Sequence, residues 1–394
     1  MERHGNGISR RRVLWGAGAA VALTALSPPT RTGAITRGGA AVPGESGRRA
    51  DLAERAIVTR HVRSLWGLPQ RQLGTLVWPA SLTDQSFGRW CYWWQAHLVD
   101  CAIDAAERAR TPERVDRVVA LARGIRTRNV TGWTNRYYDD MAWLLLALDR
   151  ARRLPGVCFE DAVNDLRGAV VEGWNPKLGA VPWRSGDDFY NTPAIGPTGI
   201  ALARLGDLAR AARLAEFLHT RLRDPASGLV LDGVHEPGGA VDRTVHTYCQ
   251  GVAIGLDTEL FSRTGDPVYR ERAAVLVAVV DDLLTDNGVI IGATDDDSGL
   301  FMGILARYLS ETALALGDPT AARIVRTSAR AAWAHRGEVD GLPLFGSDWS
   351  RPVSVAATLS QLGDTGTEPP RDLSVQLSGW MLLEADCRLS AAGY

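Results

Sequence analysis

Residues 304–319 read ILARYLSETALALGDP, and this stretch carries the two signals that decide the fold. Its apolar residues recur every three or four positions, as in Leu309, Ala313 and Leu316, which is the spacing of one face of an α-helix. The stretch then ends in a short polar turn of glycine, aspartate and proline. Aspartate there caps the next helix by accepting a bond from a free backbone N–H, and proline removes a donor that has no partner. The sequence therefore predicts two helices with a tight joint between them.

Comparable joints recur along the chain. They lie at Thr111-Pro112, at Asp207 and at Gly265-Asp266-Pro267, and a further break falls at Leu154-Pro155-Gly156. The spacing is about fifty residues, the length of one antiparallel helix pair with its loops, and about 340 residues hold six to seven such pairs. We predict an all-α fold in which six helical hairpins close into an (α/α)6 barrel; an open solenoid of helix pairs is the alternative. Short apolar runs at 229–231 and 289–291 are expected to form only local hairpins on loops.

The first 48 residues are typical of an export signal followed by a linker. Residues 9–14 read SRRRVL, which resembles the twin-arginine signature, and an apolar run follows from Val13 to Leu26. About 14 apolar residues are too few to cross a bilayer comfortably, because about 20 are needed. We expect export to the cell surface or medium, no stable membrane span, and one catalytic domain over residues 49–394. A basic, disordered tail is the alternative for residues 1–48.

Composition limits the class of partner. The chain of 394 residues is 45% apolar, which is enough for one large core. The net charge is −1, and the first forty residues hold a surplus of arginine, so the remainder is mildly acidic without a basic stripe. Nucleic acid is therefore not expected as a partner, and a neutral polymer fits better. Five widely spaced cysteines suggest neither a disulfide scaffold nor a zinc site. We expect a monomer without a cofactor.

Two adjacent aspartates, Asp139 and Asp140, precede a strongly apolar helix in the segment NRYYDDMAW, residues 135–143. Aspartate at such a place can simply cap the helix. However, the flanking Asn135 and Tyr138 offer the hydrogen-bonding group and aromatic face that a sugar ring needs. Adjacent α-carbons lie about 3.8 Å apart, so the two carboxyl groups can approach about 5 Å. That separation suits a retaining glycosidase, whereas inversion generally needs about 6.5 Å or more.

The same segment resembles the signature of glycoside hydrolase family 76, the endo-acting α-1,6-mannanases. Three further blocks agree in order, namely residues 181–194 with Pro-Trp-Arg and Asn-Thr-Pro-Ala, residues 247–255 with Tyr-Cys-Gln-Gly-Val, and residues 297–304 with Asp, Phe and Gly-Ile. The resemblance runs from about residue 60 to near the C-terminus. It implies an (α/α)6 barrel that cleaves α-1,6-mannan in the chain interior with retention of configuration. It also implies Asp139 as the nucleophile and Asp140 as the acid/base.

The substrate-binding residues that we predict are mostly aromatic or amide side chains in these blocks: Trp94, Gln95, Asn135, Tyr138, Trp183, Asn191, Tyr248, Gln250 and Asp297. Asn191 and Gln250 can alternatively satisfy loop backbone. Two positions depart from the family pattern, because Cys249 stands where asparagine is usual and Met302 where lysine is usual. Each departure removes a polar group that could contact substrate, whereas the aspartate pair is intact.

Other functions remain open at this stage. A transglycosidase would use the same site to pass the mannosyl group to another sugar, and a non-catalytic glycan-binding relative would keep only the binding. A sugar epimerase would need a histidine base in the funnel, whereas the histidines are scattered and His97 is expected to be structural. No metal site is predicted, because histidines do not pair at ligand spacing and the acidic run 295–297 lacks the rest of an EF-hand loop.

Overall fold

The computed structural model describes residues 44–292, 298–355 and 371–394. The predicted export signal lies outside the described residues, and so does Asp297. The first helix begins at Glu45, slightly ahead of the predicted domain boundary at residue 49.

Helices make up most of the described chain, so the all-α prediction is confirmed. The long helices are α1 (Glu45–Arg60), α3 (Tyr92–Arg108), α4 (Pro112–Arg128), α5 (Tyr138–Ala151), α6 (Glu160–Glu172), α7 (Thr192–Arg204), α8 (Leu208–Phe217), α9 (Thr247–Thr264), α10 (Pro267–Leu283), α11 (Phe301–Leu316), α12 (Pro319–His335) and α14 (Leu373–Ala391). The short ones are α2 (Leu82–Gln85), the π-helix η1 (Leu218–Leu222) and the 3₁₀-helix η2 (Ser298–Leu300).

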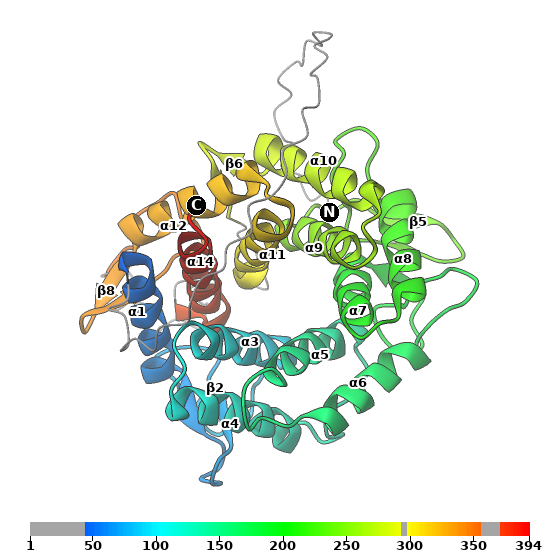
Figure 1. The fold of residues 1–394 in the computed structure, drawn as a ribbon. Helices are drawn as coiled ribbons and strands as arrows, with labels where there is room; N and C mark the ends of the chain where they lie inside the picture. The colour runs from blue at the N-terminus through cyan, green and yellow to red at the C-terminus, as the bar shows by residue number, and fades with distance from the viewer. Residues whose placement is uncertain (1–43, 293–297, 356–370) are drawn as a thin grey trace, which may run out of the picture. The chain divides into compact units, whose positions relative to one another are not determined.

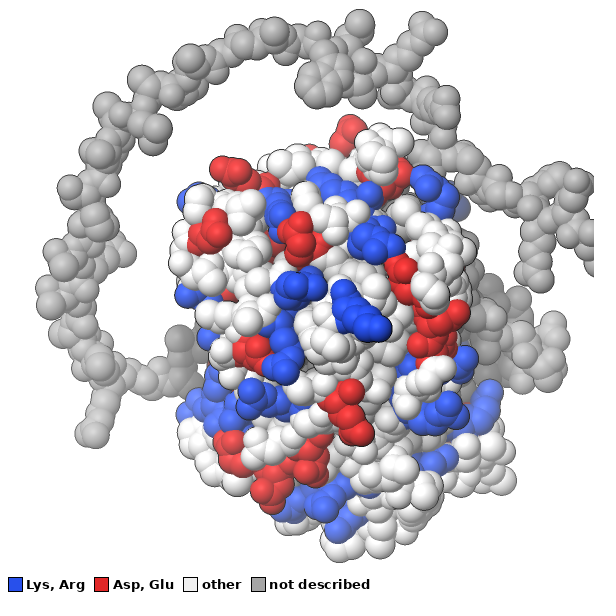
Figure 2. Space-filling view, turned by 90° about the vertical axis from the view of Figure 1, so that its right-hand side faces the viewer, with Lys and Arg blue, Asp and Glu red and all other residues white. Residues whose placement is uncertain are grey.

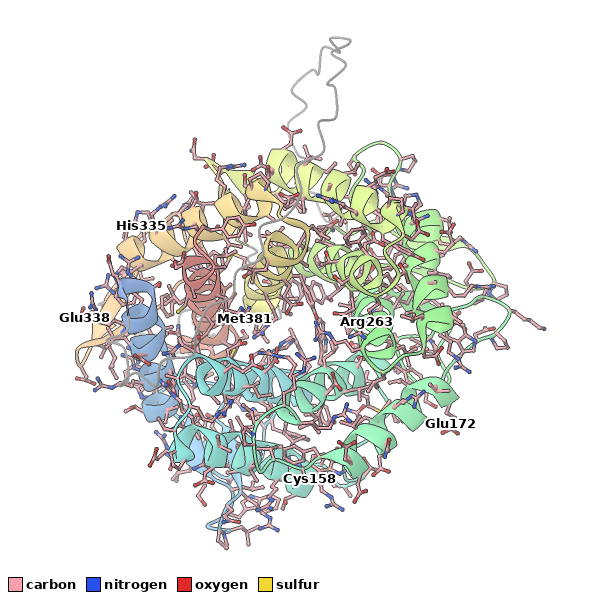
Figure 3. The ribbon with its side chains drawn as sticks, viewed as in Figure 1. Cys158, Glu172, Arg263, His335, Glu338 and Met381 are labelled. Carbon is pink, nitrogen blue, oxygen red and sulfur yellow. The ribbon has the colours of Figure 1, made fainter. Side chains whose placement is uncertain are left out.

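The helices of the described residues form two concentric layers (Figure 1). In the inner layer α3, α5, α7, α9, α11 and α14 each contact the next, and α14 contacts α3 in turn. In the outer layer α4, α6, α8, α10 and α12 each pack on the inner helix that precedes them, while α1 packs on α14. Figure 3 shows Cys158 and Glu172 near the two ends of α6, on the outside of this ring.

The two ends of the ring differ in their connections. The inner helices α3, α5, α7, α9 and α11 are each followed by a short connection into their outer partner, whereas each outer helix returns to the inner layer through a long loop. Because inner and outer helices alternate along the chain, all the inner helices run in the same direction. We call the end with short turns the tight end and the end with long loops the open end. The N-termini of the inner helices all lie at the open end.

The predicted joints are confirmed at the tight end. The side chains of Thr111, Asp207 and Asp318 each accept a hydrogen bond from the backbone N–H three residues later. The side chain of Asp266 caps α10 by accepting from the backbone N–H two residues later. Each such cap contributes about 1 kcal/mol to helix stability. Gly265 and Gly317 lie at φ of 71° and 69°, a left-handed conformation that ends the preceding helix at little cost.

Strands are short and lie in the long loops of the open end. They are β1 (Val62–Ser64), β2 (Gln72–Gly74), β3 (Phe189–Asn191), β4 (Gly233–His235), β5 (Ala240–Asp242), β6 (Thr285–Asp286), β7 (Val289–Ile290), β8 (Gly337–Val339) and β9 (Leu342–Leu344). The sheet β3-β4-β5 and the pairs β1-β2, β6-β7 and β8-β9 are all antiparallel. The predicted run at 289–291 contributes β7, while Val230 forms only an isolated bridge with Arg223. Strands are therefore loop decorations, as expected.

One described helix, Ser298–Leu316, is long and apolar enough to cross a membrane by length and composition, and 83% of its apolar window is buried inside the protein. It contains α11, which packs between α9 and α14 on the inner layer and against α12 on the outer layer. Its apolar character is thus explained by packing on several sides.

Candidate active site

A cavity of about 330 Å³ opens where the inner helices begin, at the open end. Its walls combine aromatic rings with a few polar groups, as in sites that bind small molecules or sugar units. The aromatic lining comprises Trp93, Trp143, Trp183, Phe189, Tyr248 and Phe301, and the polar lining comprises Asp139, Asn191, Asp232 and His246.

Asp139 lies in the first turn of α5, and its carboxylate faces this cavity. One oxygen, Oδ2, accepts a hydrogen bond of 3.0 Å from the indole Nε1–H of Trp183. The other, Oδ1, accepts one of 2.8 Å from the backbone N–H of Asp140. The indole N–H and the backbone N–H can donate a hydrogen bond but cannot accept one. They therefore favour the charged carboxylate, which accepts with both oxygens. The N-terminal end of α5 favours the same negative charge.

Asn135 holds the neighbouring acid. Its Nδ2 donates a 2.7 Å bond to Oδ2 of Asp140, and its Oδ1 accepts a 2.8 Å bond from the backbone N–H of Tyr137. The second bond fixes which end of the amide faces Asp140, because only the nitrogen end is left to point there. The structure therefore places Asn135 against the second aspartate of the pair, and Asn135 is not part of the cavity lining.

Trp183 is positioned by two loops that meet at the start of α5. The backbone N–H of Tyr138 donates to the carbonyl of Trp183 at 2.9 Å, and the N–H of Trp183 donates to the carbonyl of Phe189 at 2.7 Å. Tyr137 and Arg184 also form an isolated antiparallel bridge. The indole is thus fixed relative to Asp139 by backbone bonds, and it lines the cavity as predicted.

Tyr248 and Phe301 form a flat aromatic wall on the other side of the cavity. Their rings are stacked with centroids 3.8 Å apart and an angle of 6° between the planes. His246 and Trp93 pack against Phe301 with centroids 5.0 and 6.3 Å away. The stacked pair presents the face of one ring, and such an apolar face suits the C–H face of a pyranose. The prediction of Tyr248 as a sugar platform agrees with its place in the wall.

Asp232 is a second acidic group in the cavity lining, beside Asp139, and sequence reasoning missed it. Its backbone carbonyl accepts a 2.7 Å bond from the N–H of Thr192, which places it beside Asn191 at the start of α7. Burial raises the pKa of its carboxyl group, while the neighbouring His246 opposes that shift. Cys249 contacts it, with Sγ 3.8 Å from Oδ1. At Cys249 the family usually has asparagine. In this chain Asp232 therefore has a weak thiol donor as its neighbour in place of a side-chain amide.

Two predicted substrate contacts are corrected by the structure. Gln95 is 1% exposed, and its amide donates to the carbonyl of Gly74 and accepts from its N–H. Gln250 is fully buried and pairs in the same way with the N–H and carbonyl of Val230. Gln376 on α14 repeats the arrangement with Phe345. These glutamines anchor open-end loops to inner helices. Their amide groups are hydrogen-bonded to loop backbone and do not reach substrate.

Two predicted aromatic contacts are also corrected. Trp94 is 6% exposed and belongs to the core, whereas its neighbour Trp93 lines the cavity. Tyr138 is 9% exposed and packs against the end of α6, where a Cβ added at Gly173 would lie 2.3 Å from the tyrosine ring. Helical geometry explains the first correction, because neighbouring residues of a helix face directions about 100° apart.

His97 is structural, as expected. It is buried between Trp93 and Trp143, with ring centroids 5.8 and 4.6 Å away, and burial lowers its pKa to about 3. Met302, the second departure from the family pattern, is 1% exposed on α11 and does not line the cavity. No group of three or more His, Cys, Asp or Glu side chains that could hold a metal ion occurs in the described parts of the chain.

The sequence did contain signals for the missed residues. Trp93 and His97 are four apart and so share a helix face, and Trp143 lies one turn beyond Asp139 and Asp140 on α5. Asp232 follows the buried run at 229–231 and precedes glycine, a pattern for which the sequence predicts only a local hairpin on a loop. For His246 we find no sequence signal beyond its neighbour Tyr248.

Among the described residues, the face of the protein that carries α8 and β5 has no cluster of basic side chains that would attract a polyanion (Figure 2). Figure 2 shows basic and acidic side chains interspersed over the face that carries α8 and β5. Several of them pair there, including Arg221 with Glu236 and Arg272 with Glu216. This mixture leaves no cationic patch on the part of that face that the structure describes (Figure 2).

Comparison with known proteins adds independent findings. Residues 51–365 match the model of glycosyl hydrolase family 76, while a comparison with curated proteins finds no match. The α-1,6-mannanase GH76A of Salegentibacter sp. HEL1_6 is 26% identical, with a TM-score of 0.75 over 88% of this chain and 100% of that one. An inactive variant of that enzyme, with two adjacent aspartates changed to asparagine, was solved in complex with α-1,6-mannotriose.

Two more distant structures share the fold. The Lin0763 protein from Listeria innocua is 24% identical with a TM-score of 0.77, covering 89% of this chain and 99% of that one. Dfg5 from Chaetomium thermophilum, solved with glucosamine, is 15% identical with a TM-score of 0.70, covering 87% and 90%. The family model spans most of the chain and includes the aspartate pair, so the protein belongs to glycosyl hydrolase family 76.

Proposed function

We propose that this glycoside hydrolase cleaves α-1,6-linked mannan in the interior of the chain, with retention of configuration. The observation that carries the proposal is the pairing of Asp139 with donors that cannot accept a proton, next to a second carboxyl group on the same helix turn. One acid is thereby kept charged for attack, and the other is held beside it by Asn135. Family membership supports the reaction class.

In the first step, an oxygen of the Asp139 carboxylate forms a bond to the anomeric carbon of the mannose unit. The glycosidic C–O bond breaks, and Asp140 transfers its proton to the leaving oxygen. The mannosyl unit is then covalently attached to Asp139. Trp183 keeps the attacking carboxylate directed into the cavity during this step, because its indole N–H holds one of the two oxygens.

In the second step, the charged Asp140 removes a proton from water, and the oxygen of that water attacks the anomeric carbon. The bond to Asp139 breaks, which restores the carboxylate, and Asp140 again carries a proton. Two inversions at the same carbon give net retention. The stacked wall of Tyr248 and Phe301 supports the sugar ring, and Asp232 and Asn191 are in reach of its hydroxyls across the cavity.

Mannan with α-1,6 linkages is the substrate favoured by the structural comparison, since the Salegentibacter enzyme with 26% identity is an α-1,6-mannanase. An uncharged polysaccharide also suits the aromatic cavity and the mixed surface charge. We further propose that the paired helices form the six-hairpin (α/α)6 barrel predicted above, since the inner contacts return from α14 to α3. Export by the twin-arginine-type signal, and action as a monomer, complete the proposal.

The test is incubation of the protein with linear α-1,6-mannan, with sizing of the products and proton NMR of the first anomer released. We expect internal cleavage and initial formation of the α-anomer. Release of the β-anomer would contradict retention, and release of single mannose units alone would contradict internal cleavage. A second incubation with an added mannoside acceptor separates hydrolysis from transglycosylation, because transfer products would then dominate. Binding without any cleavage would identify a glycan-binding relative.

A further inference from the structure

A surface at the open end, outside the cavity, combines exposed apolar side chains with arginines. Trp66 and Leu68, in the turn between β1 and β2, are 55% and 37% exposed, and Leu82 at the start of α2 is 84% exposed. Arg71, Arg123 and Arg128 lie around them. We call these six residues the arginine–tryptophan surface. Large apolar side chains this exposed are uncommon in a protein that buries most of its others.

Hydrogen bonds join the parts of this surface, although they come from three segments of the chain. Nε1 of Trp66 donates to the carbonyl of Ser86 at 2.8 Å, which ties the β1-β2 turn to the segment after α2. Arg71 reaches α4 through a 3.0 Å bond to the hydroxyl of Thr127. Arg128 returns from α4 to the carbonyl of Phe87 at 2.9 Å. Figure 1 shows β2 beside α4, in agreement with these bonds.

The positive charges of these arginines are not balanced by neighbouring acids. Arg71, Arg123 and Arg128 donate to neutral oxygens, which belong to a hydroxyl group, to the side-chain amide of Gln70 and to backbone carbonyls. In the described residues none of the three forms an ion pair, whereas the nearby Arg89 pairs with Asp84 at 2.7 Å. The surface is therefore positive, even though the whole chain has a net charge of −1.

We propose that the arginine–tryptophan surface docks the protein on an anionic lipid surface. Guanidinium groups pair well with phosphate oxygens, and each basic residue near an anionic bilayer strengthens attraction to it. Tryptophan and leucine side chains insert at the boundary between lipid headgroups and acyl chains. That region accommodates both the apolar part of the indole and its polar N–H. A fluid bilayer accepts projecting apolar tips and cations together without needing a groove of matching shape, which favours lipid over a folded partner.

The position of the surface has a consequence that rests on the proposed function. The β1-β2 turn, α2 and the C-terminal end of α4 all belong to the open end, because they connect outer helices back to inner ones. The cavity opens at the same end. Docking therefore brings the mouth of the cavity near the lipid, where it can reach mannan chains that are carried on lipid anchors.

The test is co-sedimentation of the full chain with vesicles of phosphatidylcholine alone and of phosphatidylcholine with phosphatidylglycerol in equal parts. One variant combines Trp66→Asn and Leu82→Ser; asparagine tolerates the φ of 52° found at Trp66. A second combines Arg71→Gln and Arg123→Gln. We expect each double variant to bind the anionic vesicles roughly tenfold more weakly or worse. Binding of the unaltered chain should fall as salt is raised, because exposed charges are screened.

Matched control variants are Val275→Ser, which replaces a residue 52% exposed on α10, and Arg167→Gln on the exposed face of α6. Both should bind as the unaltered chain does. Residues 1–48 are common to all variants, so their own affinity for lipid cancels in the comparison. Equal sedimentation of the double variants and the unaltered chain would overturn the proposal. Retention on an acidic polypeptide without vesicle binding would overturn it too.

Vesicle binding needs no turnover, so its failure is distinguishable from failure of the proposed function. All variants should cleave soluble α-1,6-mannan at the same rate as the unaltered chain. Loss of the Trp66 and Arg71 hydrogen bonds should lower the melting temperature of the double variants by only a few degrees. If the chain binds vesicles normally but cleaves no mannan, the docking proposal is supported. The inference that docking brings the cavity to lipid-anchored mannan is then wrong.

Discussion

The two ends of the helical ring both hold clustered aspartates, but these have different partners. Toward the tight end, Asp104 on α3 accepts bonds of 2.6, 2.6 and 2.8 Å from Arg150, Arg307 and Arg388. At the open end, Asp139 accepts from an indole N–H and a backbone N–H, both of which are neutral. Asp104 is 3% exposed, whereas Asp139 faces a cavity.

The difference shows how the same residue type is neutralised by arginines at one end and oriented by neutral donors at the other. Three guanidinium groups cancel the charge of Asp104 and occupy its oxygens, so it can only hold the inner helices together. Neutral donors orient Asp139 without cancelling its charge, and the carboxylate stays available as a nucleophile.

Replacing either catalytic acid should abolish turnover without unfolding the protein. Asp139→Asn removes the nucleophile and Asp140→Asn removes the acid/base, and each should lower kcat on α-1,6-mannan by about a thousandfold or more. Asparagine still caps a helix, so the melting temperature should change little. Asp161→Asn in the first turn of α6 is the matched control and should retain full activity. Near-normal turnover in either catalytic variant would refute the assignment.

Asp104→Asn should instead lower stability, by about 3 to 5 kcal/mol, because it leaves buried arginines without their shared carboxylate. Urea unfolding measures this change. The matched control is Asp281→Asn, which breaks an exposed pair with Arg323 and should cost less than about 1 kcal/mol. An equal cost in both variants would show that the cluster toward the tight end does not stabilise the ring.

The contribution of Asp104 should also depend on pH. Burial alone would raise its pKa, but Arg150 and the neighbouring arginines hold that pKa well below its usual value. Because the pKa of Asp104 is lower in the folded state than in the unfolded state, where it is about 3.9, the charged carboxylate stabilises the fold above about pH 3.9. This stabilisation is lost as the pH falls below that value. The difference in unfolding free energy between Asp104→Asn and the unaltered protein should therefore be constant near neutrality and shrink below about pH 4.

Trp183→Phe keeps an aromatic ring in the cavity but removes the N–H that orients Asp139. A hydrogen bond to a charged group contributes about 1.5 to 3 kcal/mol, so kcat should fall about ten- to a hundredfold with a smaller change in KM. Trp333→Phe on the outer helix α12 is the control and should be neutral. If only KM rises, Trp183 is a sugar platform, as the sequence alone suggested, and does not orient the nucleophile.

Asn135→Ala should have the smallest effect. It removes the donor that favours the charged form of Asp140, so the basic limb of the pH–activity profile should move to higher pH and kcat should fall about tenfold. Asn135→Asp keeps the acceptor for the Tyr137 N–H and should move the limb further, because it adds a negative charge. Asn129→Ala, in the loop before the pair, is the control. An unchanged profile with a raised KM would make Asn135 a substrate contact.

The sequence predicted those features of the structure that depend on residues close together in the chain. The helix joints at Thr111, Asp207, Asp266 and Asp318 follow from side chains that bond their own neighbouring backbone. The aspartate pair Asp139 and Asp140 was predicted because its two acids are adjacent in the chain, and its catalytic role stays a prediction. Prediction failed where the partner is distant: Gln95 and Gln250 looked like sugar contacts, and nothing local reveals that Gly74 and Val230 use their amides.

By itself the sequence determined the helical repeat, the aspartate pair and the family, because each depends on residues close together in the chain or on their order. The tertiary structure alone decided that Trp93 and not Trp94 faces the cavity, that Asp232 joins Asp139 across it, and which acids are neutralised by arginine. Those outcomes depend on which helices meet across the ring. Inner helices that touch there are separated by many residues, so no local pattern encodes the contact.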